Sequence, residues 1–336
     1  MSLKYSLIIP VYNRPEEVKE LLETIAAQTF AGDFETIVIE DGSTLSSQEV
    51  VNSFQNRIDI TYLTKPNTGP GDSRNFGMQR AKGDYFIILD SDCLLPTHYL
   101  DAVNDFLQQN YVDCFGGADA ATDTFTPIQK AINYAMTSLL TTGGIRGSKH
   151  TIGRFEPRSF NMGISRKAFE ATGGFGYIHP GEDPDLTIRL WKAGFQTAFI
   201  EEAFVYHKRR ISWEKYNIQV RKFGQTRAIL NLWHPSYRKI VHWFPTLFLL
   251  GFVFAFLATV FGFWEFLLPY LIYFTLIFFD SRHINHSTEI GFLSIKAVCI
   301  QFFSYGIGFL QATFRILFSK KPPEELFPKL FFNINK

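Results

Sequence analysis

The sequence predicts an α/β domain, with a mostly parallel sheet covered by helices on both faces, followed by membrane helices. Up to about Ile240, short buried strands alternate with amphipathic helices, and polar and apolar residues mix as in globular proteins. From Trp243 to Phe279 the chain is almost purely apolar. The formal net charge of the 336 residues is only +1, which argues against nucleic acid as a partner.

The alternation of strands and helices indicates where ligands bind. The expected strands are 5–12, 34–43, 58–64, 84–92, 112–117 and 160–165. The expected helices are 14–28, 71–83, 97–109, 166–176 and 183–194, and the glycine-rich segment 141–159 is expected to be a loop. In such sheets ligands bind beyond the carboxyl ends of the strands, so the polar residues at these ends are the candidates for a site.

The apolar run from Trp243 to Phe279 is about twice the roughly 20 residues that one helix needs to cross a bilayer. It predicts a helical hairpin that turns near Gly262–Glu265. Because the second arm is short, a re-entrant hairpin remains an alternative. Basic residues dominate the preceding segment 204–240, and the positive-inside rule then places the N-terminal domain in the cytoplasm, at the inner membrane.

A third apolar segment, about Ile290–Phe318, carries small and polar residues along one helical stripe. They are Ser294, Gln301, Ser304, Gly308, Gln311 and Arg315. This helix either lies in the membrane interface or crosses the bilayer with a close-packing edge formed by Ser304, Gly308 and Ala312. We favour the interface, because a crossing after a full hairpin would translocate the lysines at 320–321. The expected regions are 1–240, a membrane region at 241–318 and a basic cytoplasmic tail at 319–336.

Two acidic residues, Asp90 and Asp92, end the buried run "FIILDSD". If the strand continues through them, both carboxylates project to one side of the sheet at its carboxyl end. That arrangement suits a hard divalent cation that completes its shell with water and diphosphate oxygens. The alternative is a solvated turn with a local hydrogen bond.

Other strand ends carry residues suited to the same ligand. Tyr12, Asn13 and Arg14 offer an aromatic face and hydrogen-bond donors, and Asp41 offers an acceptor for a base N–H. Arg74 lies early in a helix whose N-terminus favours anions. Some of these residues have a purely structural alternative. Asn13 and Asp41 could be turn or cap residues, and Arg74 could be a surface charge.

A further acidic cluster, Glu182, Asp183 and Asp185, crowds one helical turn. Like charges there tend to raise the pKa of one member. The structural alternative is that Asp183 is only the N-cap before Pro184.

The chain resembles glycosyltransferase family 2, whose members have the GT-A fold. The resemblance rests on five motifs in consistent order between Tyr5 and His207: SLIIPVYNRPEEV, VIEDGST, NTGPGDSRNFGMQRAKGDYFIILDSD, NMGISRKAFEATGGF and GEDPDLTIRLWKAGF. It implies a GT-A nucleotide-diphospho-sugar transferase as the catalytic domain at 1–240, with the Rossmann-like mixed sheet and helices on both faces that this fold has. It also implies inverting transfer of a sugar from a UDP-, GDP- or dTDP-sugar donor.

The resemblance also implies roles for single residues. It places Asp41 on the nucleobase and Asp92 on a metal ion, Mg²⁺ or Mn²⁺, and makes Asp183 the general base. His207 matches a position where such enzymes often bind metal or diphosphate, with a purely structural histidine as the alternative. Pro184 departs from the apolar residue expected between the two acids, which leaves the carboxylate orientation open. The residues assigned to donor binding are Pro10, Tyr12, Asn13, Arg14, Asp41, Arg74, Asp90, Ser91 and Glu182.

A cytoplasmic active site tethered beside a bilayer meets lipid-linked sugars at high local concentration, so we expect a lipid-linked or cell-surface polysaccharide acceptor. One alternative is a sugar nucleotidyltransferase, but PVYNRPEE lacks the glycine-rich, lysine-containing phosphate loop that it would need. The other alternative is a non-catalytic, membrane-bound subunit that binds nucleotide sugars or acts as a scaffold. The joint presence of Asp41, Asp92 and Asp183 argues against it.

Overall fold

A computed structural model describes residues 3–120, 125–143, 154–207 and 212–332, and the side chain of His207 lies outside this description. By internal contacts the chain forms two compact units. The first comprises 1–122, 147–208 and 332–336, and the second comprises 123–146 and 209–331. This grouping differs from the regions expected from sequence, because the second unit includes 209–240. Most of the expected loop at 141–159 and the end of the expected tail lie outside the described residues.

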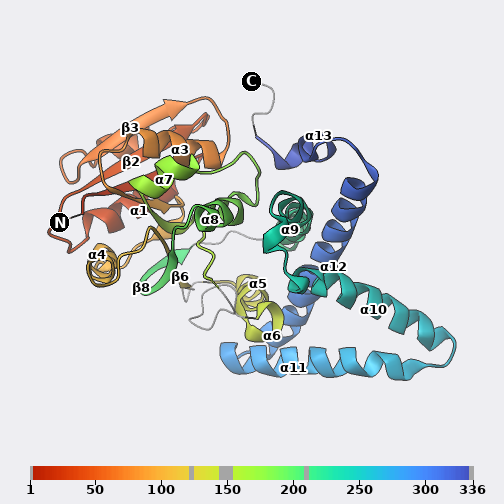
Figure 1. Ribbon diagram of the computed structural model, residues 1–336. Coiled ribbons are helices and arrows are strands. Elements are labelled where there is room, and N and C mark those ends of the chain that lie inside the picture. The colour runs from red at the N-terminus through yellow and green to blue at the C-terminus, as the bar shows by residue number, and fades with distance from the viewer. Residues whose placement is uncertain (1–2, 121–124, 144–153, 208–211, 333–336) are drawn as a thin grey trace. The chain divides into compact units, whose positions relative to one another are not determined.

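The first unit is built on a mixed sheet with the strand order β3-β2-β1-β4-β7-β6-β8-β5 (Figure 1). Its strands are β1 (Tyr5–Val11), β2 (Phe34–Asp41), β3 (Ile60–Lys65), β4 (Tyr85–Leu89), β5 (Cys93–Leu94), β6 (Cys114–Ala120), β7 (Asn161–Ser165) and β8 (Thr197–His207). Strands β1 to β4 run parallel, whereas β7 is antiparallel to both β4 and β6. The carboxyl ends of β1, β2 and β4 therefore meet at one edge, as the sequence predicts.

Both faces of this sheet are buried, because successive side chains of each strand point to opposite faces. Leu7 and Ile9 of β1 belong to one core, and Ile8 belongs to the other. Helices α1 (Pro15–Ala26), α2 (Gln48–Asn52) and α4 (Tyr99–Gln109) contribute to the first core. Helices α3 (Pro70–Arg80), α7 (Arg166–Thr172) and α8 (Glu182–Lys192) contribute to the second.

The expectation that β4 continues through Asp92 is wrong. The strand ends at Leu89, and the N–H of Cys93 donates to the carbonyl of Asp90 (3.1 Å), which closes a turn. Cys93 then begins the short strand β5, where it lies opposite His207 of β8. The two aspartates are consequently held by a turn and do not share a face of a strand.

The second unit is helical. It contains α5 (Pro127–Thr137), α6 (Leu139–Thr142), α9 (Trp213–Trp233), α10 (Phe244–Val260), α11 (Leu268–Asn285), α12 (Thr288–Phe318) and α13 (Pro323–Leu326). Short 3-10 helices lie at Pro235–Tyr237, Ile240–Trp243, Trp264–Leu267 and Pro328–Leu330. The predicted hairpin is confirmed as secondary structure: α10 and α11 are joined through Gly262, whose φ of +88° reverses the chain (Figure 1).

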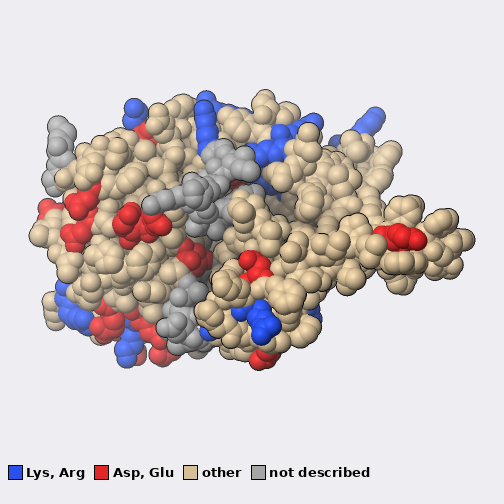
Figure 2. Space-filling model, turned by 90° about the horizontal axis from the view of Figure 1, so that it is seen from below, with Lys and Arg blue, Asp and Glu red and all other residues tan. Residues whose placement is uncertain are grey.

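Three segments are long and apolar enough to cross a membrane: Ile240–Val260, Trp264–Asn285 and Thr288–Phe318. In the most apolar 18-residue window of each segment, 11% of the residues are buried in the first two and 44% in the third. Figure 2 shows that the surface of the α10–α11 hairpin, at the right of the view, is nearly uncharged on the face seen. Such an exposed apolar surface indicates contact with lipid.

Helix α12 packs along the basic helix α9 through the stripe identified in the sequence. Tyr216 donates to Gln301 (2.6 Å), Arg221 donates to Gln311 (2.8 Å) and Ser304 donates to Asn217. A Cβ on Gly308 would lie 2.3 Å from the carbonyl oxygen of Arg221, so only glycine permits this approach. Ser304 and Gly308, which the bilayer-crossing alternative assigns to a close-packing edge, therefore do pack closely, and their partner is α9.

Candidate active site

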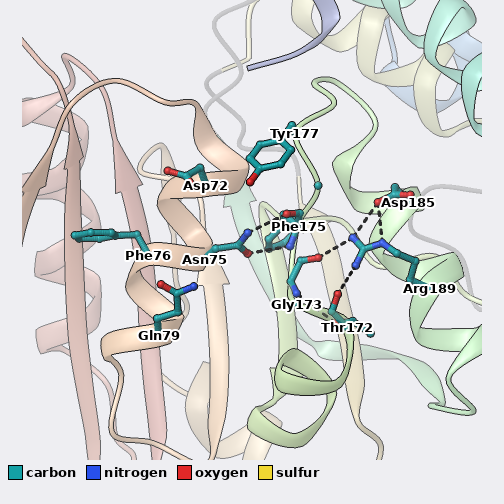
Figure 3. A pocket seen from close by; sticks show the side chains of 12 residues that line it. Asp72, Asn75, Phe76, Gln79, Thr172, Gly173, Phe175, Tyr177, Asp185 and Arg189 are labelled. Atoms are coloured by element: carbon teal, nitrogen blue, oxygen red, sulfur yellow. Dashed lines mark hydrogen bonds and ion pairs between the residues drawn. The ribbon is translucent and has the colours of Figure 1, made fainter. Parts of the chain in front are cut away.

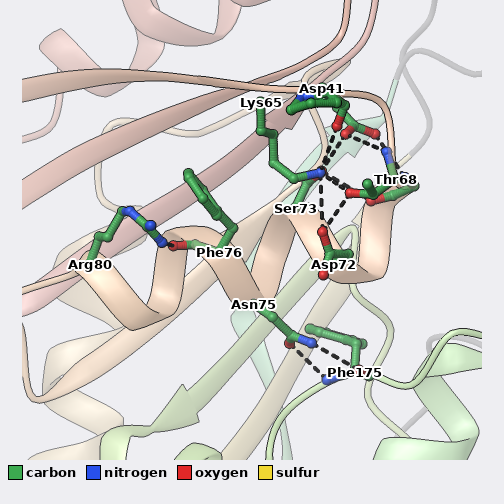
Figure 4. Close-up of polar contacts among 11 residues, drawn as sticks. Asp41, Lys65, Thr68, Asp72, Ser73, Asn75, Phe76, Arg80 and Phe175 are labelled. Carbon is green, nitrogen blue, oxygen red and sulfur yellow. Dashed lines mark hydrogen bonds and ion pairs between the residues drawn. The ribbon is translucent and has the colours of Figure 1, made fainter. Parts of the chain in front are cut away.

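Asp41, the last residue of β2, anchors the loop that leads into α3 (Figure 4). Its Oδ1 accepts hydrogen bonds from Lys65 Nζ (2.7 Å) and the N–H of Thr68 (3.0 Å), and its Oδ2 accepts from the N–H of Gly69 (3.0 Å). Asp41 is only 4% exposed. Asp41 thus holds a loop, which is the structural alternative stated for it above. With three hydrogen bonds accepted from described residues, Oδ2 keeps one lone pair that could accept a base N–H.

Lys65 is a member of this cluster that sequence reasoning missed. Its side chain is 7% exposed, and its ammonium lies 2.7 Å from Asp41 and 3.1 Å from Asp72. It also donates to Thr68 and to Ser73 Oγ (3.3 Å). The signal that could have revealed it is register: Lys65 ends β3 directly opposite Asp41 in the parallel ladder.

The end of β1 supplies a second loop anchor. Asn13 has a φ of +56°, and its Oδ1 accepts from the N–H groups of Thr44 (2.8 Å) and Leu45 (2.9 Å). Asn13 therefore forms a turn and fixes the loop after β2. Pro10 lies within β1, and Tyr12 is 52% exposed beside this turn.

Arg74 connects two carboxylates from distant parts of the chain. Its Nη2 donates to Asp90 Oδ1 (3.0 Å), and its Nη1 donates to Glu182 Oε1 (3.3 Å). The side chain is 4% exposed, so the alternative of a surface charge is wrong. Helix α3 links Arg74 to the Asp41 loop. Gly69, the N-cap of α3, donates to Asp41, and Arg74 lies about one turn further along the same helix.

Asp183 does not cap α8, since the N-cap is Gly181 with a φ of +123°. Its Oδ1 is buried and makes no hydrogen bond within the described part of the chain. Burial and the neighbouring charge of Glu182 raise the pKa of Asp183, against opposing effects of Arg74 and Arg158. A buried carboxylate oxygen with an open lone pair and a raised pKa is what a general base requires.

Glu182, next to Asp183, is held in its charged form. Burial alone would raise the pKa of Glu182, but the charge and hydrogen bond of His179, together with Arg74, lower it to about 2. His179 Nδ1 lies 2.9 Å from Glu182 Oε1. Sequence reasoning missed this histidine, although it stands three residues before the acidic cluster. The pKa of Glu182 is therefore lowered and that of Asp183 is raised. Two neighbouring carboxyl groups that differ in this way are suited to different roles in acid–base chemistry.

The turn after β4 carries the residues expected to bind metal. Asp92 accepts a hydrogen bond from Arg14 Nη1 (2.7 Å), and Ser91 is 5% exposed. His207 lies across from Cys93 in the β5–β8 pair, so its backbone is beside this turn. In the described residues, no group of three histidine, cysteine or carboxylate side chains could hold an ion alone. The carboxylate of Asp92 is a hard oxygen donor, the ligand type that Mg²⁺ accepts, and in this structure it is bound by Arg14.

A separate cavity of about 390 Å³ lies beside α3 (Figure 3). Its lining includes Asp72, Asn75, Phe76 and Gln79, which share one face of α3, together with residues of the loop from Thr172 to Tyr177. Asn75 accepts from the N–H of Phe175 (2.8 Å) and donates to its carbonyl (2.9 Å). This contact fixes the loop that leads to His179 and Glu182. Arg74 does not lie on the lining face of α3.

The mixed sheet, with its acidic residues at the carboxyl ends of β2 and β4, defines a protein of the GT-A fold. The chain belongs to glycosyl transferase family 2, because the profile of that family matches residues 6–173, half of the 336 residues. Both conclusions confirm the resemblance drawn from the motifs.

Curated relatives align with about a third of the chain. An uncharacterized glycosyltransferase of Rickettsia bellii is 38% identical over 107 residues, which cover 32% of this chain and 15% of that protein. The poly(ribitol-phosphate) beta-N-acetylglucosaminyltransferase TarS of Staphylococcus aureus is 30% identical over 114 residues, 33% of this chain and 20% of that protein. The aligned part is thus a fifth or less of each relative.

The fold extends further than these alignments. The structure of the mannosyltransferase PcManGT from Pyrobaculum calidifontis, solved with GDP-mannose and Mn²⁺, superposes with a TM-score of 0.58. The superposition covers 96% of this chain and 89% of that one at 15% identity. At that identity the likeness shows a shared fold alone.

Proposed function

We propose that this protein is an inverting glycosyltransferase that moves a sugar from a nucleotide-diphosphate donor to a lipid-linked or cell-surface polysaccharide acceptor. The observation that carries the proposal is the buried Oδ1 of Asp183, which faces no hydrogen-bond donor in the described residues and lies beside the Arg74–Glu182 pair. Family membership supports the same reaction class.

In this reaction Asp183 takes the proton of the acceptor hydroxyl. The acceptor oxygen forms a bond to the anomeric carbon as the bond from that carbon to the diphosphate oxygen breaks on the opposite face. A positioned base of this kind contributes roughly 100- to 10,000-fold to the rate. Glu182 stays ionised and bound to Arg74, so it holds the site together and takes no proton.

The negative charge of the leaving diphosphate would be offset by Arg14 and by a metal ion held at Asp92. Arg14 is paired with Asp92, but it is 44% exposed, so this pair can be exchanged for a contact with phosphate. Arg74, by contrast, is buried between two carboxylates. Asp92, with His207, would hold Mg²⁺ or Mn²⁺, and such an ion supplies positive charge to the diphosphate oxygens when it is bound. Asp41 and the loop from Thr68 to Gly69 are assigned to the nucleobase, with Pro10, Tyr12, Asn13, Asp90 and Ser91 around the rest of the donor.

The acceptor is proposed from the helical unit and the relatives. The exposed hairpin of α10 and α11 supports insertion into a bilayer, and TarS by its name acts on poly(ribitol-phosphate). The lysines and arginines between residues 204 and 240 favour the cytoplasmic side of the inner membrane for the catalytic unit. The polar contacts between α9 and α12 support an interfacial α12, because α9 carries charges that a bilayer core excludes.

The decisive experiment incubates the detergent-solubilised full chain with labelled UDP-, GDP- and dTDP-sugars, with and without Mn²⁺. We expect turnover of one nucleotide class, with inversion at the anomeric carbon as read by NMR. Binding of a nucleotide sugar with no hydrolysis or transfer on any glycolipid acceptor would favour the non-catalytic alternative.

A further inference from the structure

His179 lies in the segment that joins α7 to α8, three residues before Glu182, and it contacts Glu182 and Phe332. Its Nδ1 lies 2.9 Å from Glu182 Oε1, and its ring centroid lies 5.7 Å from that of Phe332. Phe332 is in turn fixed by its N–H, which donates to the carbonyl of Tyr177 (3.0 Å). The imidazole is therefore held between an aromatic ring and a buried carboxylate.

Glu182 Oε1 is shared between the imidazole of His179 and the guanidinium of Arg74. It accepts from His179 and from Arg74 Nη1 (3.3 Å), and the carboxylate is only 6% exposed. The Arg74 guanidinium also serves Asp90, so a single arginine faces two carboxylates there. Without His179, Arg74 would be the one cation in contact with Glu182 and Asp90 in the described residues, and this surplus of negative charge would lie beside Asp183, which Arg158 also faces.

We propose that His179 is a positioning residue of the catalytic centre, which holds the Glu182 carboxylate against Arg74 and compensates its charge so that Asp183 is free to ionise. This inference rests on the proposed function, because it assumes that Asp183 is the base. The charged groups that face His179 are Glu182 and Asp183 on α8 and Arg74 on α3. Burial and Arg74 oppose protonation of His179, but the two carboxylates outweigh them and raise its pKa.

Removing the charge of His179 should raise the pH at which Asp183 ionises. At the acidic pH where Asp183 titrates, His179 is protonated in the native protein and favours ionisation of Asp183. Replacing it by neutral glutamine in His179→Gln removes that charge, so Asp183 keeps its proton to higher pH. The acid limb of the pH profile of kcat/KM is expected to move upward by about one pH unit. At alkaline pH, where Asp183 is ionised in either protein, the rates of the two should be nearly equal.

The test measures this profile for the native chain, His179→Gln, His179→Lys and His98→Gln. Lysine restores a cation and should return the acid limb toward the native position. His98, the N-cap residue of α4, is exposed and serves as the control, which should leave the profile unchanged. An acid limb that does not move in His179→Gln overturns the inference, and so does an equal loss of rate at every pH, which indicates a merely structural role.

A second measurement separates this inference from the proposed function. NMR titration of the histidine-labelled full chain should show that His179 loses its proton at lower pH in Glu182→Gln than in the native chain, because Glu182 raises the pKa of His179. If the native chain turns over no donor, the proposed function fails, while this titration still decides whether the His179–Glu182 pair exists as described. A titration of His179 that is unchanged in Glu182→Gln would refute the pair.

Discussion

Arg74 and Glu182 lie 108 positions apart in the chain, yet Nη1 of the arginine lies 3.3 Å from Oε1 of the glutamate in a buried contact. The same guanidinium reaches Asp90 at 3.0 Å. Three elements, α3, α8 and the turn after β4, are therefore fixed to one another by a single side chain. A planar guanidinium suits this role because its donors form a rigid fork.

Replacing Arg74 by lysine should weaken the site although the charge is kept. A single ammonium cannot reproduce both contacts in this geometry, so one buried carboxylate loses a partner. We expect the free energy of unfolding to fall by about 1–3 kcal/mol, measured by denaturant titration in detergent. Arg80→Lys, on the exposed side of the same helix, is the control and should change it by less than about 0.5 kcal/mol. Equal effects of the two substitutions would contradict the assigned role of Arg74.

Replacing Asp183 by asparagine should abolish transfer. Asparagine has nearly the same shape but cannot accept the acceptor's proton, so kcat is expected to fall by roughly 100-fold or more. The dissociation constant of the nucleoside diphosphate, measured by calorimetry, should stay close to the native value. Retained turnover in Asp183→Asn would remove this residue as the base.

The raised pKa of Asp183 predicts how transfer depends on pH. The base acts only when ionised, so transfer is lost as pH falls through that raised pKa. The acid limb of kcat/KM should therefore lie above about 3.9, the ordinary pKa of an aspartate. A profile whose acid limb coincides with that ordinary value would show that burial and Glu182 do not tune this carboxyl group.

Replacing Lys65 by methionine should destabilise the first unit and loosen its nucleotide site. It removes the ammonium from a buried pair whose side chains are 7% and 6% exposed, and so leaves Asp41 with backbone donors alone. We expect a loss of about 3–5 kcal/mol in unfolding free energy and weaker binding of nucleoside diphosphate. In the double variant Lys65→Met with Asp41→Asn, much of the stability should return because no buried charge is left unpaired. Asp72, the other partner of Lys65, is 35% exposed and still accepts a hydrogen bond from Thr68. Failure of the double variant to recover any stability would argue that packing, and not charge, governs this cluster.

Replacing Gly308 by leucine should separate α12 from α9. A Cβ at this position would approach the Arg221 carbonyl oxygen to 2.3 Å, which the helices relieve only by moving apart. Overpacking of this kind typically costs about 1–3 kcal/mol, seen as a lower melting temperature in detergent. Ile307→Leu changes the adjacent, partly exposed position and is the control. A melting temperature unchanged by the glycine substitution would mean that the two helices do not pack this closely.

The sequence by itself determined the alternation of strands and helices, the edge of the sheet where the acidic residues gather, the apolar hairpin and the small-residue edge of α12. These features are local, because apolar periodicity and turn residues act within a few positions of the chain. The family, too, followed from short ordered motifs.

Only the tertiary structure decided what the charged residues contact. Asn13 and Asp41 hold loops, Arg74 is buried between two carboxylates, and Asp92 is paired with Arg14. Lys65 and His179 showed no motif at all, because their partners come from β2 and α8 through register and loop geometry. The energy of a buried charge depends on its neighbours in space, and those neighbours are set when the sheet and its helices pack together.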